Sequence, residues 1–371
     1  RDPLWSRGLG DVYKRQKYDV KTTFIIINVV IVVFTIFYVN RKFRLNTLNC
    51  SRLRKIYSDN KPKILSINEN NPYKLRDFYI KTAYNCCCGG QFKNDYVNLC
   101  AMDACIQQGA RCLDFEIYSL DNKPVVATSS INDFTVKEVY NQIPMGDVLR
   151  RINEVAFSSG SCPNYKDPLF LHFRIMSNNC TIYNELAKMI ENNPVFNNRT
   201  LGPKYSHENH GYNLGQVDIC KLRGKIIIMV DASNPLYQHT ALDEYVNIAS
   251  GSIFMKLLRY KDVKFTQDLS LEEFNKKQMS LVIPDLSPHN RNLNFNVARL
   301  YGCQFIGMCF QNYDGELQNY NEFFDSEKTA FVLKPERLRF VPVTIKAPRN
   351  NPRSWSWAPL KFGTDYYSYT I

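Results

Sequence analysis

Short apolar segments rich in β-branched residues alternate with segments of helical periodicity through most of this chain of 371 residues. The strand-like segments are residues 110–118, 124–128, 168–176, 225–230, 279–283 and 303–310. The helix-like segments are residues 98–108, 136–143, 147–157, 181–192, 241–248 and 315–324. Strands that alternate with helices pair into a parallel sheet whose faces the helices cover. The length of the region fits a closed (β/α)8 barrel, so the predicted fold class is α/β.

Residues 22–39 form an apolar segment that contains no charged residue. As a helix this segment is about 27 Å long, which is enough to cross the hydrocarbon core of a bilayer. A buried strand and a signal peptide are the alternatives, but the apolar part of a signal peptide is usually shorter and is followed by small residues. We therefore expect residues 22–40 to be a single transmembrane helix.

The charges that flank this segment predict its orientation. Basic residues are dense after it, at Arg41, Lys42 and Arg44, whereas the basic residues before it are interrupted by Asp11 and Asp19. The positive-inside rule then favours a globular part on the cytoplasmic side of the membrane.

Three Asn-X-Ser/Thr sequons begin at Asn49, Asn179 and Asn198. They become glycosylation sites only in the opposite orientation.

The composition agrees with a membrane location and an anionic partner. The net charge is +12, yet the basic residues form neither a long Lys/Arg block nor a zinc-finger spacing, so we expect a lipid surface and no nucleic acid. The 12 cysteines, which include the run Cys86–Cys88, fall short of a disulfide scaffold, and we expect free thiols in a reducing compartment.

The remaining segments lie outside the alternating region. We expect residues 1–21 to be a leader, with a truncated natural start and a non-native segment as the alternatives, residues 41–73 to be a polar linker and residues 342–371 to be a C-terminal tail.

Five segments, in order, resemble motifs of the eukaryotic phosphoinositide-specific phospholipase C family. The segment Gly109-Ala110-Arg111-Cys112-Leu113-Asp114-Phe115-Glu116 resembles the family's "G-x-R-x-L-[ED]-x-[ED]" strand. The other four are residues 221–228 ("L-x-G-K-[IV]-[IL]"), 275–284 ("N-x-x-x-[LM]-[ST]-R-x-Y-P"), 301–311 ("G-[CS]-Q-x-V-A-x-N-[FY]-Q") and 331–335 ("G-Y-[VL]-L-K-P").

This resemblance covers about residues 75–340 and implies a distorted TIM-type barrel with its active site at the carboxyl ends of the strands. The barrel would consist of an X-like half, residues 74–232, and a Y-like half, residues 233–341. The family's reaction cleaves a phosphoinositide, with two histidines as acid and base and a calcium ion that activates the inositol hydroxyl.

Both histidines of the family pattern are replaced in this chain. The family's "S-H-N-T" aligns with Ala83-Tyr84-Asn85-Cys86, which puts Tyr84 at the first histidine, and Thr128 stands at the second. The resemblance keeps Asn85, Asp114 and Glu116 as candidate calcium ligands.

A further calcium ligand, a Glu in the family, aligns with Arg174. A guanidinium there would supply a positive charge without the metal, so Arg174 is also a candidate for phosphate binding. His172 points to the same strand face and is a candidate substitute base; a buried histidine bonded to a carboxylate is the alternative.

The phosphate-binding groups are also altered. The two lysines of the family pattern align with Met229 and Asp231, and its Arg and Tyr align with Leu281 and Ile283; Ser280 remains a substrate-binding candidate.

His207 and His210 have the spacing of a metal motif but lie in a polar loop, where we interpret them as surface residues.

Neutral tyrosine and threonine side chains are poor proton shuttles near neutral pH. We therefore interpret the chain as a catalytically degraded member that binds a phosphorylated headgroup or a protein partner at the membrane. Two alternatives stay open: an active phosphodiesterase that uses Arg174 and His172, and a structural membrane protein whose barrel mouth is closed by Arg174 ion pairs. A solvent-exposed Arg174 would favour binding or activity, whereas burial would favour a structural role.

Overall fold

The computed structural model describes residues 20–134, 136–201, 203–206, 213–266, 269–342 and 357–371. The chain divides into two compact units, residues 1–339 and residues 340–371. The second unit falls in the predicted tail, and its described part contains an antiparallel hairpin of β12 (Lys361–Gly363) and β13 (Ser368–Thr370).

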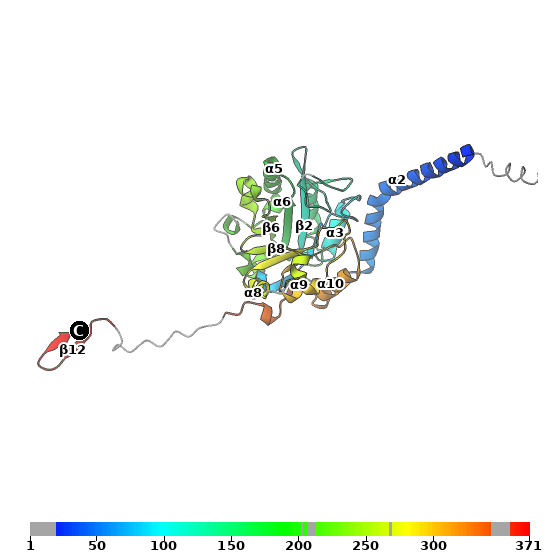
Figure 1. The fold of residues 1–371 in the computed structure, drawn as a ribbon. Helices are drawn as coiled ribbons and strands as arrows, with labels where there is room; N and C mark the ends of the chain where they lie inside the picture. Colours follow the sequence, from blue (N-terminus) through cyan, green and yellow to red (C-terminus); the bar gives the residue numbers. More distant parts are fainter. Residues whose placement is uncertain (1–19, 135, 202, 207–212, 267–268, 343–356) are drawn as a thin grey trace, which may run out of the picture. The chain divides into compact units, whose positions relative to one another are not determined.

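A nearly closed barrel of eight parallel strands forms the centre of the first unit (Figure 1). In pairing order the strands are β7 (Ile248–Ser250), β6 (Ile226–Asp231), β5 (Leu169–Ile175), β2 (Cys112–Leu120), β1 (Phe78–Ala83), β10 (Phe305–Met308), β9 (Met279–Ile283) and β8 (Met255–Arg259). Three further strands extend the sheet. Strand β3 (Lys123–Val126) pairs with β2, β4 (Ile143–Pro144) pairs with β3, and β11 (Phe331–Leu333) pairs with β1. The predicted (β/α)8 barrel is therefore confirmed.

Aromatic side chains fill part of the barrel interior. The rings of Phe170 on β5 and Phe305 on β10 lie 5.2 Å apart, although their strands are not neighbours in the sheet. The ring of Phe331 lies 6.5 Å from that of Phe170. Contacts across the barrel axis of this kind make the interior a packed core and leave functional groups to its ends.

Helices connect and cover the strands (Figure 1). The α-helices of the barrel are α3 (Leu99–Gln107), α4 (Met145–Val155), α5 (Cys180–Glu191), α6 (Pro194–Asn197), α7 (Tyr260–Lys264), α8 (Ser270–Lys277), α9 (Phe295–Leu300) and α10 (Gly315–Ser326). Short 3-10 helices are η1 (Leu75–Asp77), η2 (Pro203–Tyr205), η3 (Leu214–Gln216), η4 (Ile219–Leu222), η5 (Pro235–His239), η6 (Ala241–Tyr245) and η7 (Glu336–Leu338).

Two predicted helices are wrong. Residues 241–248 form only the short 3-10 helix η6 before β7 begins at Ile248. Residues 136–142 have no helical structure and lead into β4. Long-range bonds hold this segment extended. The Glu138 amide donates to Thr128 O, and its carboxylate accepts from Ser129, Ser130 and Lys93. Tertiary hydrogen bonds thus override the local helical pattern.

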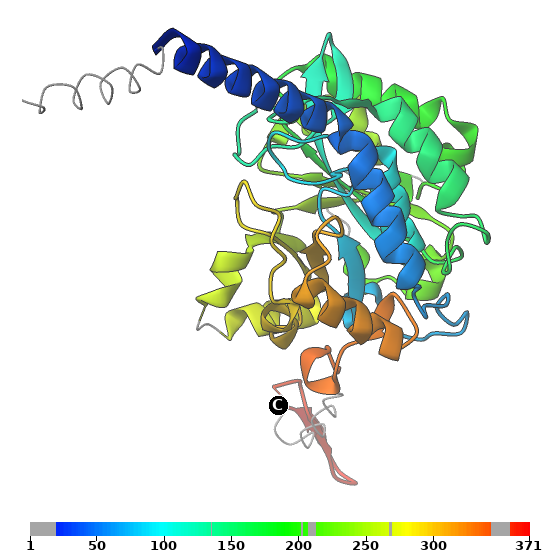
Figure 2. The ribbon, with the colours of Figure 1, turned by 90° about the vertical axis from the view of Figure 1, so that its right-hand side faces the viewer.

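Helix α2 (Val20–Asp59) joins the predicted membrane segment to the barrel without a break. Its apolar first half is exposed along its length, and by length and composition it is a candidate membrane span. The second half lies along the side of the barrel (Figure 2), where Leu53 and Tyr57 are buried. The predicted linker over residues 41–73 is therefore wrong for residues 41–59, because Cys50, Leu53 and Tyr57 recur at helical spacing and are buried on the barrel side of the helix.

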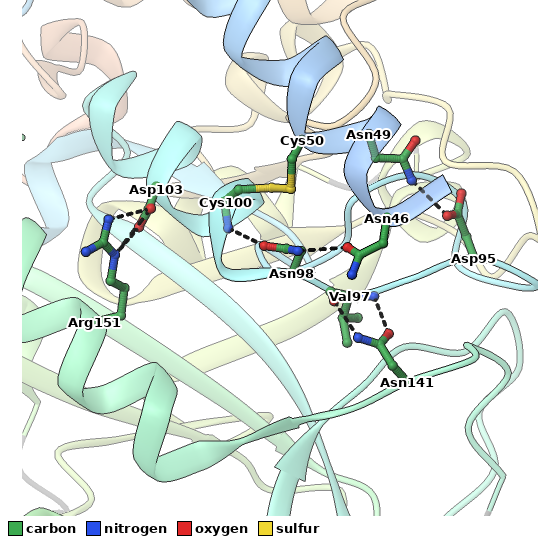
Figure 3. Close-up of a disulfide and its surroundings, with 10 residues drawn as sticks. All are labelled: Asn46, Asn49, Cys50, Asp95, Val97, Asn98, Cys100, Asp103, Asn141 and Arg151. Atoms are coloured by element: carbon green, nitrogen blue, oxygen red, sulfur yellow. Dashed lines mark hydrogen bonds and ion pairs between the residues drawn. A yellow bond between two sulfur atoms is a disulfide. The ribbon is translucent and has the colours of Figure 1, made fainter. Parts of the chain in front are cut away.

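Covalent and polar contacts fix the second half of α2 (Figure 3). A disulfide joins Cys50 to Cys100, the second residue of α3. The Asn49 amide donates to Asp95 Oδ1 at 2.8 Å, and the Asn98 amide donates to Asn46 Oδ1 at 2.7 Å. The prediction of unpaired cysteines is therefore wrong for Cys50 and Cys100, which lie far apart in the sequence but adjacent in the fold.

Candidate functional site

The pairing register of β2 and β5 brings four of the predicted site residues together. Asp114 lies opposite His172, and Glu116 lies opposite Arg174. Residues two apart on a strand share a face, so all four side chains project from the same side of the sheet. The spacing predicted this arrangement from the sequence.

The turn after β1 adds a fifth residue to this cluster. Asn85 ends the strand with a left-handed backbone, φ 44°, a conformation that asparagine tolerates better than most residues. This turn directs the Asn85 amide N–H to Asp114 Oδ2 at 3.0 Å, and its side-chain amide donates to Glu116 Oε2 at 3.2 Å. The structure thus places together the residues aligned with the calcium ligands.

The guanidinium of Arg174 stands among their oxygen atoms. Its Nη2 lies 2.7 Å from Asn85 Oδ1, 2.9 Å from Asp114 Oδ2 and 3.4 Å from Glu116 Oε2. Its Nε donates to Asp114 Oδ1 at 3.0 Å. The ring of Tyr84 covers the guanidinium, with 4.8 Å between Cζ and the ring centroid. Charge-assisted hydrogen bonds of this number hold the side chain in one position.

Burial and charge act against each other on the pKa values of this cluster. Burial alone would raise the pKa of Asp114, but the Arg174 charge and the hydrogen bond with His172 outweigh it and hold that pKa below its usual value. Burial raises the pKa of Glu116, and Arg174 offsets only part of that rise. Burial would lower the pKa of Arg174, yet the neighbouring Asp114 carboxylate raises it well above its ordinary value.

The donor set therefore does not fit calcium while Arg174 is in place. Calcium takes six to eight oxygen ligands at about 2.3–2.6 Å. Here the oxygens of Asn85, Asp114 and Glu116 already accept hydrogen bonds from a cation of the protein itself. The positive charge of Arg174 is also opposed by two carboxyl groups, so little of it is left for a phosphate.

A serine that the sequence analysis missed completes a hydrogen-bonded chain. His172 Nδ1 lies 2.6 Å from Asp114 Oδ1, and its Nε2 lies 2.8 Å from Ser250 Oγ, at the end of β7. This order of groups resembles a Ser-His-Asp triad. No motif marks Ser250, and only the fold shows that the end of β7, which pairs with β6, lies close to His172 on β5.

The segment after β1 covers the cluster. Tyr84 packs edge-on against Phe92, with 5.7 Å between the ring centroids, and the Thr128 hydroxyl donates to Phe92 O at 3.3 Å. The residues at both family-histidine positions thus hold the covering segment in place. Arg174 is 4% exposed, and no member of the cluster is more exposed than that.

Ser280 lies apart from this cluster. It is the second residue of β9, near the amino end of the strand, where its hydroxyl donates to Asn275 Oδ1 at 2.6 Å. Ser280 is fully buried and its amide donates to Gln304, so its hydrogen-bonding capacity is used within the protein. His207 and His210 lie outside the described residues.

Solved structures with this fold include two animal proteins. PLC21 from L. pealei matches with a TM-score of 0.60 and 18% identity, over 75% of this chain and 39% of that chain. PLC21 from S. officinalis matches with a TM-score of 0.56 and 17% identity, over 75% of this chain and 39% of that chain. The match to a calcium-dependent phosphoinositol-specific phospholipase C from a Pseudomonas sp. has a TM-score of 0.44 and 10% identity, over 69% of this chain and 97% of that chain, which is too weak to carry an argument.

No protein-family model matches the chain, and no curated protein sequence matches it. The matched region spans about two fifths of each PLC21 chain, and the identities are low, so the likeness concerns the fold. The eight-stranded parallel barrel, its strand order and these two neighbours agree with the motifs in the sequence. The chain therefore has the barrel fold of the phospholipase C-like phosphodiesterases.

Proposed function

We propose that this chain is a membrane-anchored phospholipase C-like barrel without phosphodiesterase activity, and that it acts as a structural module. The burial of Arg174 among Asn85, Asp114 and Glu116 is the observation that supports this proposal. A phosphorylated headgroup would have to displace the covering segment and then compete with two carboxyl groups for the guanidinium. The cost of displacing the covering segment and the competition with the carboxyl groups both oppose binding of an anion.

The loss of acid–base groups supports the same proposal. General acid–base catalysis contributes about 10²–10⁴-fold per step, and the side chains at the family-histidine positions have structural contacts instead. The unbroken helix α2 supports anchoring, because its apolar half leads directly into the half that packs on the barrel.

The test is hydrolysis of phosphatidylinositol and its bisphosphate by the purified full chain in detergent or vesicles, with and without calcium. An active phospholipase C serves as the positive control, and a cooperative thermal transition shows that the chain is folded. We expect no turnover above the protein-free rate under either condition. Turnover by the folded wild type would overturn the proposal.

The hydrogen-bonded chain Asp114–His172–Ser250 supports a second candidate, an active enzyme with a rewired site. In this case His172 would act as the base once the covering segment opens. Turnover by the wild type that is lost in His172→Asn, with an unchanged thermal transition, would establish this alternative. Turnover that survives His172→Asn would exclude His172 as the base.

A further inference from the structure

The Cys50–Cys100 disulfide lies shortly after the candidate membrane span. Disulfides form and persist in oxidising compartments and are rare where cellular thiols keep cysteines reduced. The Cα atoms of the pair are 5.8 Å apart, within the usual range, and the bond connects two helices that also pack on each other through polar contacts. The cross-link thus belongs to the folded barrel and indicates where the barrel folds.

The other cysteines are compatible with an oxidising compartment. Most of the free thiols are buried, namely Cys86, Cys87, Cys88, Cys105, Cys112, Cys162, Cys303 and Cys309. Buried thiols are largely protected from oxidants. Cys180 is exposed and Cys220 is partly so, and the Cys220 thiol lies 3.2 Å from Asn71 O.

One of the three basic residues that predict a cytoplasmic barrel has a structural contact, which weakens that argument in part. The Lys42 ammonium donates to Asn94 O at 3.2 Å and lies 5.8 Å from the ring centroid of Tyr140. Further along α2, Arg52 donates to Gln311 O at 3.3 Å. Docking of α2 on the barrel thus accounts for the charges of Lys42 and Arg52, whereas Arg41 and Arg44 are exposed.

The asparagine side chains of the three sequons differ in exposure and in their hydrogen bonds. Asn49 is buried and bonded to Asp95. Asn179 caps α5 through its side-chain oxygen, and its amide donates to Ser119 and Asn122. Asn198, which follows α6, is exposed. A bulky glycan on the amide nitrogen fits only the third position without breaking a side-chain contact of the fold.

We propose that the barrel lies on the non-cytosolic side of the membrane and carries an N-linked glycan on Asn198. The inference is independent of whether the barrel is catalytic.

Two covalent steps follow from this proposal. The thiols of Cys50 and Cys100 would lose two protons and two electrons to a disulfide-bearing oxidoreductase, which is reduced to its dithiol. In the second step the Asn198 Nδ2–sugar C1 bond would form while the C1–O bond to a polyprenyl diphosphate breaks. The lipid diphosphate leaves, and the amide proton passes to a base of the transferase.

The test uses the full chain expressed in cells with a secretory pathway, or translated into sealed microsomes. Treatment with an amidase that removes N-glycans should increase the gel mobility of the wild type by one step, which is the shift that the loss of a single glycan causes. Asn198→Gln and Thr200→Ala should abolish that step, whereas the matched Thr200→Ser variant retains the sequon and should retain it. Asn179→Gln should leave the step unchanged.

Protease added outside sealed microsomes provides a second readout. We expect the barrel to be protected until detergent is added, and to contain the Cys50–Cys100 disulfide, detected by thiol alkylation before and after reduction. Digestion of the barrel in sealed microsomes would overturn the orientation. A glycan step that persists in Asn198→Gln would overturn the assignment of the site, and a protected barrel without any step would do the same.

Discussion

At the scale of single residues, one arginine stands among the side chains that the family resemblance assigns to calcium. Arg174 Nη2 contacts the three side chains that the family resemblance assigns to calcium. A buried ion pair contributes little net stability when formed, but removing one partner leaves an uncompensated charge. Replacing Arg174 alone should therefore destabilise the protein, whereas replacing it together with Asp114 and Glu116 should have a smaller effect on stability.

The first prediction concerns that sensitivity. Arg174→Met leaves Asp114 and Glu116 buried without their cation, and it should lower the free energy of unfolding by about 3–5 kcal/mol. The triple variant Arg174→Met, Asp114→Asn and Glu116→Gln should recover a large part of the loss, because no unpaired charge remains. Urea unfolding of the full chain in detergent measures both. A single variant as stable as the wild type would show that the ion pairs do not hold the cluster.

The second prediction concerns Lys81 on β1. Its side chain is fully buried, its ammonium has no hydrogen-bond partner among the residues that the structure describes, and burial lowers its pKa from 10.5 to about 8. Between about pH 8 and 10.5 the unfolded chain holds a proton that the folded chain has released, so stability should rise with pH across this window.

Lys81→Met should remove that rise and stabilise the protein at pH 7 by about 3 kcal/mol, because one pKa unit corresponds to about 1.4 kcal/mol. Thermal unfolding at a series of pH values tests this for both chains. An unchanged rise between pH 8 and 10.5 in the variant would assign it to other groups.

At the scale of elements, α2 forms hydrogen bonds with the segment after β1 that covers the Arg174 cluster. Asp95 and Asn98 belong to the stretch that follows Phe92, and both bond to α2. Asp95 also accepts from the Gln91 amide at 2.9 Å. A Cβ at Gly90 would lie 2.1 Å from Asp95 Oδ2, so this turn requires glycine. The helix that contains the candidate membrane span is thus also part of the cover.

The third prediction concerns the cross-link between these elements. The disulfide spans a sequence separation of 50 residues. Closing a loop of this length stabilises a protein by about 2–4 kcal/mol. The Cys50→Ser/Cys100→Ser variant should lose about that amount in urea unfolding and should no longer respond to reductant. If the wild type does not respond to reductant either, the cross-link contributes nothing to stability.

At the scale of the whole molecule, the sequence predicted the barrel well because the matching motifs are structural. The Gln304 amide donates to Arg76 O, Asn275 O and Gln278 O, and Lys334 donates to Asn275 O. These bonds tie segments that are distant in the sequence, so their residues identify the fold whatever the barrel does.

The sequence predicted the cluster around Arg174 for a similar reason, since i, i+2 spacing on two strands fixes a common face. It could not predict Ser250 or the Cys50–Cys100 pair, because both depend on which elements become neighbours. The prediction from the sequence was also wrong for residues 41–59. Most of these residues are polar, and the few apolar side chains that the barrel buries, such as Leu53 and Tyr57, were too sparse to indicate a packed helix. The X-like and Y-like halves remain predictions.

The fourth prediction concerns the contribution of α2 to the first unit. A chain that begins at residue 61 loses the burial of Leu53 and Tyr57 and the bond from the Tyr57 hydroxyl to Phe310 O, 2.5 Å long. Under reducing conditions, in which neither chain has the Cys50–Cys100 cross-link, it should be less stable than a chain that begins at residue 41 by about 3–6 kcal/mol, from burial of two large side chains. Thermal unfolding compares the two. Equal stability would show that α2 is only an anchor.

The continuity of α2 also limits how far the barrel can move from the candidate membrane span. A flexible linker of n residues has a root-mean-square end-to-end distance of about 5–6 Å times the square root of n, so a domain attached to it moves over that distance. Here Val39 and the cross-linked Cys50 are on the same helix, which bends between its two halves (Figure 2), so at 1.5 Å per residue they are at most about 16.5 Å apart. If the apolar half spans a bilayer, the barrel is therefore held close to the bilayer surface, because a helical connection cannot extend as a flexible one does.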